Sequence, residues 1–310
     1  MAAGTGSAGT AAPWALRELA EGVHVHEQLP GGWCLNNAGL ITAGGRAVLI
    51  DTAATRARAQ RLRQAVERVV PSGPDAVVNT HFHGDHTFGN DQFTPRATVI
   101  AHEQTRSDMA EAGLALCGIW PDVDWGDPQL TLPDTTFVDR LTLRLGELTV
   151  ELSQVGPAHT ASDVVAWVPR RGVLFTGDVA WSGVTPYVLM GSVEGSLRAL
   201  AELRRLGPRV VVPGHGPAGG PEVLDATEAY LRRLRELARE GRRAGRSVLE
   251  TARSADLGPF AALVDAERLV GNLHRAYAEL DGLAPGERID VAASLKEMAE
   301  FHGGLPHCAA

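Results

Sequence analysis

Three histidines and one aspartate stand within six positions in the segment "HFHGDH", in a chain that has only 11 histidines. His81 and His83 are two residues apart, and in extended backbone this spacing directs both side chains to the same side. Gly84 permits a sharp turn, after which Asp85 and His86 can reach a neighbouring position. Imidazole nitrogens and carboxylate oxygens are common ligands of Zn²⁺ and similar divalent ions. The segment therefore predicts half of a metal site, with donors for two ions.

Three further residues with metal-binding side chains lie at the ends of predicted strands. His159 follows a strand, Asp178 ends the apolar segment "VLFTGD", and His215 stands between two glycines in "VVVPGHG". Taken singly, each has an ordinary alternative role, either as a hydrogen-bonded turn histidine or as an aspartate that caps the next segment. Because α/β sheets carry their chemistry in the loops beyond strand ends, the three together predict the other half of the site.

Apolar patterning predicts alternating strands and helices over the first 220 residues, as in an α/β protein. The strands are expected at 22–28, 37–42, 46–51, 75–80, 97–101, 141–145, 148–155, 163–169, 172–178 and 209–216. The helices are expected at 55–70, 102–116 and 194–207, with a long loop at 117–136. From Pro221 onward the chain is predicted to be mostly helical, and Leu231, Leu234 and Leu237 form one apolar face there.

The motifs, in their order, resemble the metallo-β-lactamase-fold hydrolase superfamily. They are "LIDT" at 49–52, "THFHGDH" at 80–86, His159 in "AHT", "LFTGD" at 174–178 and "VPGHG" at 212–216. The resemblance covers roughly residues 20–220 and implies an αββα sandwich with the metals at one edge. We therefore expect this α/β domain at 14–220, a disordered leader at 1–13, and a helical extension at 221–310 packed on the same domain.

The family's ligand set can be carried over to the matching positions of this sequence. It would place one metal on His81, His83 and His159, a second on Asp85, His86 and His215, and Asp178 between them. This set resembles that of glyoxalase II-like members. The commonest subclass of true lactamases has a cysteine at the bridging position, where this chain has Asp178, and lacks a histidine at the position of His86. Antibiotic hydrolysis is therefore not expected as the main activity. Zn²⁺ is the expected metal at both positions, with Fe or Mn as alternatives.

Asp51, in "LIDT", matches a family position beneath the site. Support of the metal ligands and a plain strand-end turn remain equal interpretations of this residue.

Two adjacent divalent ions can share a water and lower its pKa, so the implied nucleophile is a hydroxide held by both metals. The expected reaction is hydrolysis of an ester, thioester, lactone or amide, with Asp85 as the catalytic residue that orients the hydroxide and handles its proton. A further resemblance to bacterial polyketide cyclase/thioesterase-type members ranks thioesters and esters first. The alternatives are an iron-dependent sulfur dioxygenase-type oxidoreductase of the same fold, a β-lactamase, a phosphodiesterase, or a binding module without activity.

Aromatic residues in two segments, 117–136 and 180–192, are expected to contact the substrate. The residues are Trp120, Trp125, Trp181 and Tyr187. Both segments follow elements whose ends should lie near the metals, and an aromatic, apolar lining suits an acyl or ring-bearing small molecule. The alternative is that these side chains only fix the loops to the core.

Composition narrows the class of partner and the compartment. With 29 basic and 37 acidic residues the net charge is −8, which argues against a nucleic-acid partner. There is no apolar run of 18 residues and no secretory signal pattern, so neither a membrane partner nor secretion is expected. Three scattered cysteines, Cys34, Cys117 and Cys308, predict a reduced, cytoplasmic setting, where they act as small hydrophobic residues. Metal ligation by Cys34 or Cys117 is the alternative.

The arginine-rich helix at 230–246 is interpreted as a solvated helix whose arginines pair with Glu228, Glu236 and Glu240. The C-terminal helices are expected to pack over the sandwich or to form a homodimer. The remaining histidines are interpreted as ordinary surface or core residues; they are His24, His26, His102, His274, His302 and His307.

Overall fold

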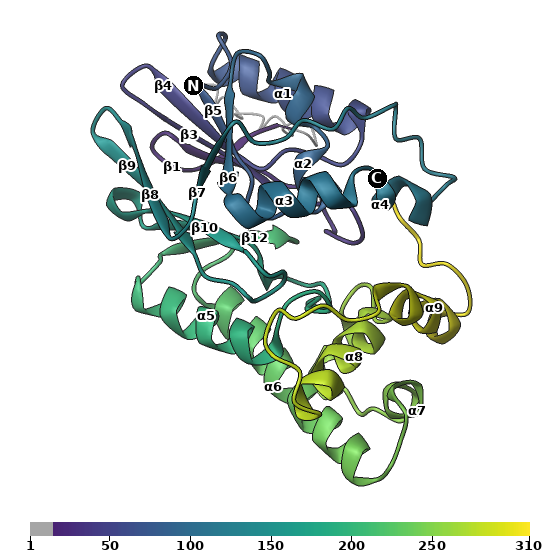
Figure 1. Ribbon diagram of the computed structural model, residues 1–310. Coiled ribbons are helices and arrows are strands. Elements are labelled where there is room, and N and C mark those ends of the chain that lie inside the picture. Colours follow the sequence, from purple (N-terminus) through teal and green to yellow (C-terminus); the bar gives the residue numbers. More distant parts are fainter. Residues whose placement is uncertain (1–14) are drawn as a thin grey trace, which may run out of the picture.

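Two β-sheets packed face to face form the centre of the molecule, and helices cover the outer side of each sheet (Figure 1). The computed structural model describes residues 15–310, so the leader predicted at 1–13 lies outside the described residues. The architecture confirms the predicted α/β, αββα sandwich with C-terminal helices.

The first sheet has seven strands in sequential order. They are β1 (Arg17–Ala20), β2 (Val23–His26), β3 (Ala38–Ala43), β4 (Arg46–Ile50), β5 (Ala76–Val78), β6 (Thr98–His102) and β7 (Thr135–Phe137). The first four strands pair antiparallel, whereas β4 to β7 pair parallel. The carboxyl ends of β4, β5 and β6 therefore meet at one edge of the sandwich.

The second sheet has five strands in the order β12-β11-β10-β9-β8. They are β8 (Arg140–Leu145), β9 (Leu148–Gln154), β10 (Val164–Val168), β11 (Val173–Trp181) and β12 (Val210–His215). β11 and β12 pair parallel, with Trp181 opposite His215, and helix α5 (Val193–Arg205) connects them.

The other helices surround the two sheets. They are α1 (Arg56–Val69), α2 (Gly84–Thr87), α3 (Glu103–Ala112), α4 (Ala115–Ile119), α6 (Glu222–Arg243), α7 (Val248–Arg253), α8 (Arg268–Leu280) and α9 (Val291–His302), with short 3₁₀ turns at Asn90–Gln92, Pro169–Arg171 and Gly258–Ala262.

Three apolar layers hold the sandwich together, and burial of this surface drives their association. Side chains such as Ile41, Leu152 and Phe175 fill the space between the two sheets. Leu49 and Leu62 pack the first sheet against α1. The third layer joins the outer face of the second sheet to α5, α6 and α8.

The structure departs from the sequence expectations at two elements near the site. The helix expected at 102–116 breaks at Gly113, whose φ of 53° ends α3 and lets the chain turn into α4. The strand expected at 172–178 continues as β11 to Trp181, because its last residues pair with the end of β12. This extension places the Trp181 side chain beside His215.

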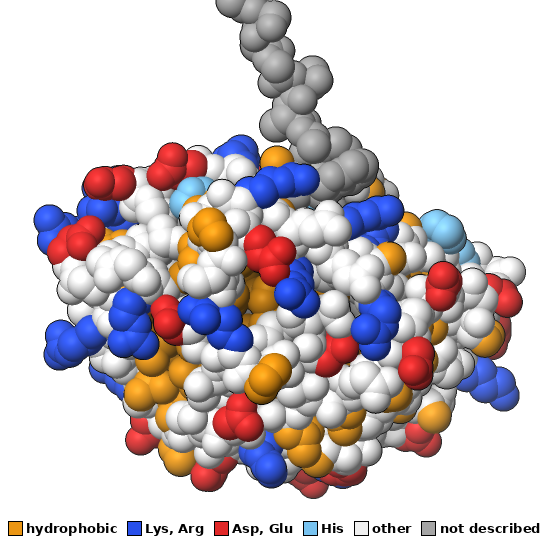
Figure 2. All heavy atoms as spheres, turned by 90° about the horizontal axis from the view of Figure 1, so that it is seen from above, with side chains coloured by type: hydrophobic (Ala, Val, Ile, Leu, Met, Phe, Trp, Pro, Cys, Tyr) orange, Lys and Arg blue, Asp and Glu red, His pale blue; other side chains and the backbone are white. Residues whose placement is uncertain are grey.

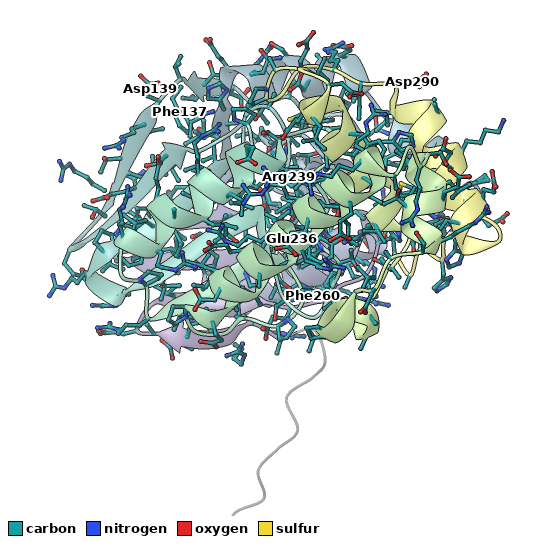
Figure 3. The ribbon with its side chains drawn as sticks, turned by 90° about the horizontal axis from the view of Figure 1, so that it is seen from below. Phe137, Asp139, Glu236, Arg239, Phe260 and Asp290 are labelled. Carbon is teal, nitrogen blue, oxygen red and sulfur yellow. The ribbon has the colours of Figure 1, made fainter. Side chains whose placement is uncertain are left out.

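Helix α6 is the long helix that carries Glu236 and Arg239 on its exposed side (Figure 3). Arg232 pairs with Glu228 at 2.5 Å, and Arg233 lies 3.3 Å from Glu236. These ion pairs confirm the interpretation of the arginine-rich segment as a solvated helix.

On the face in Figure 2, basic and acidic side chains are interspersed and form no continuous basic stripe. Among residues 15–310, no helix combines the length and apolar character needed to cross a bilayer.

Candidate metal centre

Seven histidine and aspartate side chains converge at the edge where strands of both sheets end. His81 and His83 follow β5, Asp85 and His86 belong to the four-residue helix α2, and His159 lies in the loop after β9. Asp178 is in β11 and His215 is the last residue of β12. Their donor atoms form two adjacent groups, in each of which all atoms lie within 4.8 Å of one another. The groups are His81, His83, His159 and Asp178, and Asp85, His86 and His215.

In the first group, three imidazole nitrogens face a common point. His83 Nδ1 lies 3.1 Å from His81 Nε2 and 2.8 Å from His159 Nε2. Asp178 Oδ2 approaches the same point, at 3.4 Å from His159 Nε2. Three nitrogens and one oxygen are a donor set that suits a tetrahedral divalent ion.

In the second group, Asp85 Oδ2 lies 3.2 Å from His215 Nε2. Asp178 Oδ1 lies 3.2 Å from His86 Nε2, and Asp178 Oδ2 lies 3.5 Å from His215 Nε2. The Asp178 carboxylate therefore lies between the two groups, where it could bridge two ions.

For three of the five imidazoles, a hydrogen bond on the far side of the ring fixes the nitrogen that faces the centre. His159 Nδ1 lies 2.5 Å from the Tyr187 carbonyl oxygen, and His215 Nδ1 lies 3.0 Å from that of Gly31. His86 Nδ1 lies 2.8 Å from Asp51 Oδ2. Carbonyl and carboxylate oxygens only accept, so each Nδ1 carries the proton and each Nε2 lone pair points inward.

Two inward-facing atoms, His86 Nε2 and Asp178 Oδ1, are buried without a hydrogen-bond partner among the described residues. With His86 neutral, a lone pair facing a carboxylate oxygen at 3.2 Å is repulsive, and unpaired buried polar atoms cost free energy; in the metal-free protein a proton on His86 Nε2 relieves this, at the place where a cation would lie. A cation between them would remove both costs. The residues therefore fit a pair of divalent ions.

Metal binding requires neutral imidazoles and ionised carboxylates, and most of the protonation states suit it. His86 is the exception: burial lowers its pKa, but Asp178 and Asp85 together raise it well above its ordinary value, so a bound metal ion would have to displace that proton. Burial lowers the pKa of His83 to about 3 and lowers the pKa of His81 well below its ordinary value. Burial acts to raise the pKa of Asp178, but the surrounding histidines, His215 first, hold it well below its usual range. The pKa of Asp85 is likewise lowered, because His86 and His215 outweigh its burial.

Asp51 supports the site from beneath the second group. It is buried, with a φ of 59° that few non-glycine residues adopt. Its Oδ1 accepts from the Thr80 backbone nitrogen at 2.8 Å, and its Oδ2 accepts from Thr80 Oγ1 at 2.7 Å as well as from His86. Of the two interpretations, the structure favours support of the ligands over a plain turn.

Gly214 leaves the space that the Asp178 carboxylate occupies. A Cβ atom at this position would lie 1.8 Å from Asp178 Oδ1 and 2.8 Å from the Gly177 carbonyl carbon. Any larger residue would therefore require either the carboxylate between the two donor groups or the end of β12 to move.

Comparison with known proteins places this site in a family. The family model described as the Metallo-beta-lactamase superfamily matches residues 31–215, which is more than half of the chain. The chain belongs to the metallo-beta-lactamase superfamily. The members of this superfamily are mainly metal-dependent hydrolases.

The chain is similar to curated relatives with different names. A hydroxyacylglutathione hydrolase of Xanthomonas euvesicatoria pv. vesicatoria (strain 85-10) is 29% identical over 269 residues, covering 83% of this chain and 91% of the relative. A metallo-beta-lactamase type 2 of Bacteroides fragilis is 22% identical over 227 residues, covering 70% and 84%. Among solved structures, a metallo-beta-lactamase from Pontibacter korlensis has a TM-score of 0.59 at 22% identity, covering 70% of this chain and 98% of that one. That structural likeness shows the shared fold.

A cavity of about 90 Å³ adjoins the superfamily's metal centre, and aromatic side chains form much of its wall. Trp120, Trp181 and Tyr187, three of the four aromatic residues expected to contact the substrate, line it. Trp125 lies elsewhere: its ring packs against Phe88, and its Nε1 donates to the Trp120 carbonyl at 3.0 Å. The fourth aromatic residue therefore holds Trp120 in place and does not contact the cavity.

Several wall residues had no signal in the sequence. Trp33 and Arg268 line the cavity, although no motif marks either of them. Cys34 also lines it, yet no cysteine belongs to the metal-binding groups found among the described residues. Of the other histidines, His274 pairs with Glu297 at 3.0 Å, as expected for an ordinary helix-surface residue.

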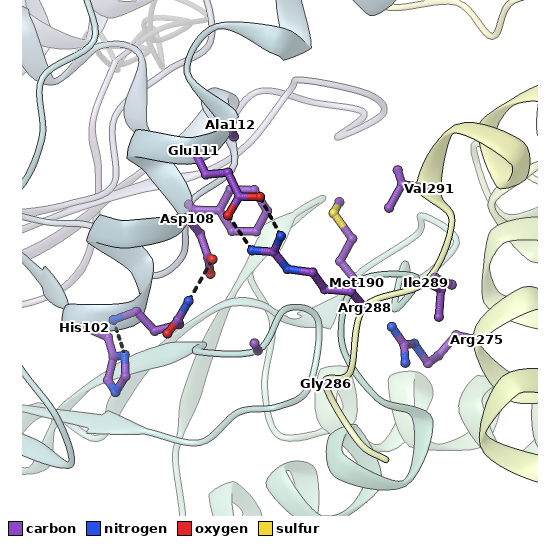
Figure 4. Close-up of a pocket in the computed structure, with 13 residues that line it drawn as sticks. His102, Asp108, Glu111, Ala112, Met190, Arg275, Gly286, Arg288, Ile289 and Val291 are labelled. Atoms are coloured by element: carbon purple, nitrogen blue, oxygen red, sulfur yellow. Dashed lines mark hydrogen bonds and ion pairs between the residues drawn. The ribbon is translucent and has the colours of Figure 1, made fainter. Parts of the chain in front are cut away.

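A second, larger cavity of about 760 Å³ lies beside the first. Met190 and Val291 line both cavities, and Phe82, between the ligands His81 and His83, lines the larger one. Figure 4 shows Arg288 and Glu111 facing each other within this larger cavity, where their side chains form a bidentate ion pair at 2.5 Å. The metal centre thus borders a small inner chamber, which shares two wall residues with a large outer chamber.

Proposed function

We propose that this protein is a metal-dependent hydrolase that cleaves an ester, thioester or lactone, with an acyl thioester as the first choice. One observation carries the proposal: two donor groups of the required chemistry, joined by Asp178, line a chamber at the edge of a hydrolase fold. The relative named hydroxyacylglutathione hydrolase supports the thioester choice. We propose Zn²⁺ at both positions, with Fe or Mn as alternatives.

Two divalent ions, when bound, would supply Lewis acidity that lowers the pKa of a water shared between them. The chain's own contribution begins with Asp85, whose carboxylate lines the chamber and is ionised because its pKa is low. We assign Asp85 to orient the attacking water and to take up its proton. Asp51, the Tyr187 carbonyl and the Gly31 carbonyl hold the imidazoles in fixed tautomers. Trp120 and Trp181 keep bulk water from the reacting carbonyl.

The sizes of the two chambers favour an extended substrate. A space of about 90 Å³ holds little more than the reacting group, whereas about 760 Å³ lies in the range of sites for drug-sized ligands. We infer that the scissile carbonyl occupies the inner chamber and that the rest of the acyl or thiol portion extends past Met190 into the outer one. A polyketide-type acyl thioester is a substrate of suitable size.

The test compares turnover of a substrate panel with metal content. Purified protein, loaded with Zn²⁺, is assayed on short and long acyl thioesters, lactones and a β-lactam. Asp85→Asn is expected to lower kcat by about 10²- to 10⁴-fold on the preferred thioester while the fold is retained. The control is Asp91→Asn, an aspartate paired with Arg56 at 3.5 Å that does not line either chamber.

Two results would overturn the proposal. One is full activity of Asp85→Asn. The other is an iron-loaded protein that consumes oxygen and hydrolyses nothing in the panel, which would establish the oxidoreductase alternative. Preference for the β-lactam would replace the thioester by a different hydrolytic substrate.

A further inference from the structure

The guanidinium of Arg268, the first residue of α8, is buried beside the metal centre although it is not one of the donor residues. Its NH1 donates to the Thr185 carbonyl at 3.1 Å, and its NH2 lies 2.8 Å from Asp265 Oδ2. A buried arginine costs free energy unless its charge is paired and hydrogen-bonded, and these contacts meet most of that need.

Two indole rings contact the same guanidinium. The Arg268 Cζ atom lies 4.1 Å from the ring centroid of Trp33 and 4.8 Å from that of Trp181. Cation–π contacts of this kind are strongest where water is excluded, and Trp181 is buried. Arg268 therefore fixes the position of the Trp181 ring.

Trp181 in turn contacts a predicted metal ligand. Its ring stacks on that of His215, with centroids 4.8 Å apart and an angle of 13° between the planes. Its Nε1 donates to the Asp178 carbonyl at 2.7 Å, so the indole also holds the backbone of the bridging residue. The His215 ring is also restrained at Nδ1, which lies 3.0 Å from the Gly31 carbonyl oxygen and 3.2 Å from that of Gly32. These contacts fix the tautomer, whereas the stack fixes the plane of the ring.

We propose that Arg268 is a positioning residue that acts through Trp181 to align His215 for metal binding. Through this contact, α8 sets the affinity of the metal position formed by Asp85, His86 and His215. The C-terminal helices are then part of the metal centre and not only a cover for the second sheet. The inference concerns metal binding alone, so it is independent of the proposed substrate.

The test is a titration of the metal-free protein with Co²⁺, in which the absorption spectrum reports occupancy of the two positions. Arg268→Met keeps an apolar chain of similar length but removes the planar, charged group. It is expected to weaken the second binding step about 10- to 100-fold, in line with other residues that support metal ligands. The first step should change much less, because the Trp181 ring meets that of His159 only edge to face, with centroids 5.6 Å apart. Arg268→Lys keeps the charge without the planar fork, so it should recover only part of the affinity.

Arg275 provides a matched control, because it is a second buried arginine on the same helix. It donates to the Leu189 and Glu287 carbonyls at 2.9 Å and 2.8 Å, and neither of these partners belongs to the stack of Trp181 on His215. Arg275→Met should lower thermal stability to a similar extent as Arg268→Met without changing the second Co²⁺ affinity. A loss of affinity equal in both variants would overturn the proposal, because it would reflect general destabilisation.

A second variant keeps the proposal testable if Arg268→Met does not fold. Trp181→Leu removes the stack on His215, whereas the backbone nitrogen of residue 181 can still donate to Thr227 Oγ1. This variant should give the same selective loss of the second Co²⁺ ion. Unchanged binding of both ions in the folded variants would refute the positioning role. So would unchanged metal affinity with a raised KM, which would place Arg268 in contact with the substrate.

Discussion

Asp51 Oδ2 lies 2.8 Å from His86 Nδ1, and this contact determines which nitrogen of His86 faces the metal centre. Asp51→Asn can present an NH₂ group to the ring, which would favour the opposite tautomer and turn a protonated Nε2 inward. We expect the second metal position to lose about 10- to 100-fold in affinity, measured by metal titration. Asp75→Asn is the control, because Asp75 also caps a strand, accepting from the Ala47 nitrogen at 2.8 Å, but belongs to neither donor group. Equal affinities in Asp51→Asn and wild type would contradict this account.

Gly214→Ala tests the position of the Asp178 carboxylate. The added Cβ would lie 1.8 Å from Asp178 Oδ1, so either the carboxylate or the end of β12 must move. We expect fewer than two metal ions per chain by elemental analysis and a loss of turnover of at least about tenfold. Gly118→Ala, where an added Cβ meets nothing within 4 Å, should retain the metal content of wild type. Full metal content in Gly214→Ala would show that Asp178 does not need this space.

The stability of the metal-free protein should depend on pH through its buried imidazoles. Burial holds the pKa of His83 near 3, against an ordinary value of 6.5, and lowers that of His81 as well. The unfolded chain therefore binds these protons below pH 6.5 while the folded protein does not, so the free energy of unfolding falls as the pH drops from 6.5 toward 3. His86 has the opposite effect on stability. Burial lowers its pKa, but Asp178 and Asp85 together raise it above 6.5, so its contribution to the free energy of unfolding is present below pH 6.5 and is lost as the pH rises above that value.

The contribution of His83 can be isolated by comparison with His83→Gln. Urea unfolding at pH 7 and at pH 5, with chelator present, should show a smaller loss of stability on acidification in the variant than in wild type. An identical pH dependence in the two proteins would mean that His83 is protonated in the folded state.

Met190→Trp tests the passage between the two chambers, since Met190 lines both. The larger side chain should fill the junction and lower kcat/KM for long acyl thioesters at least about tenfold, while short thioesters retain most of theirs. Leu280→Trp, at an exposed position at the end of α8, should change neither. Equal losses on short and long substrates would indicate that the outer chamber does not bind the substrate.

The sequence predicted that the seven histidine and aspartate side chains converge, because their positions follow from local patterns. Strands such as β5 and β12 can be recognised from short apolar runs, and residues at their ends must lie at the edge of the sheets. His83, Asp178 and His215 could therefore be found without any knowledge of the tertiary structure. Trp181 was expected in a loop, but the strand before it extends because its last residues pair with β12.

The walls of the inner chamber could not be predicted in the same way, because they depend on contacts between distant parts of the chain. Arg268 reaches Trp33 and Trp181 only after α8 has packed on the second sheet. Trp120 is held from the other end of the chain, by a hydrogen bond to the Pro306 carbonyl at 2.7 Å, and the C-terminus lies beside α4 (Figure 1). Neither contact leaves a periodic pattern or a spacing in the sequence.

The most direct test of the metal centre is anomalous X-ray diffraction from crystals of the metal-loaded protein, combined with elemental analysis of the same sample. We expect two ions per chain, one among His81, His83 and His159, the other among Asp85, His86 and His215, with Asp178 between them. A single ion, no ion, or anomalous density away from these residues would contradict the two-metal centre.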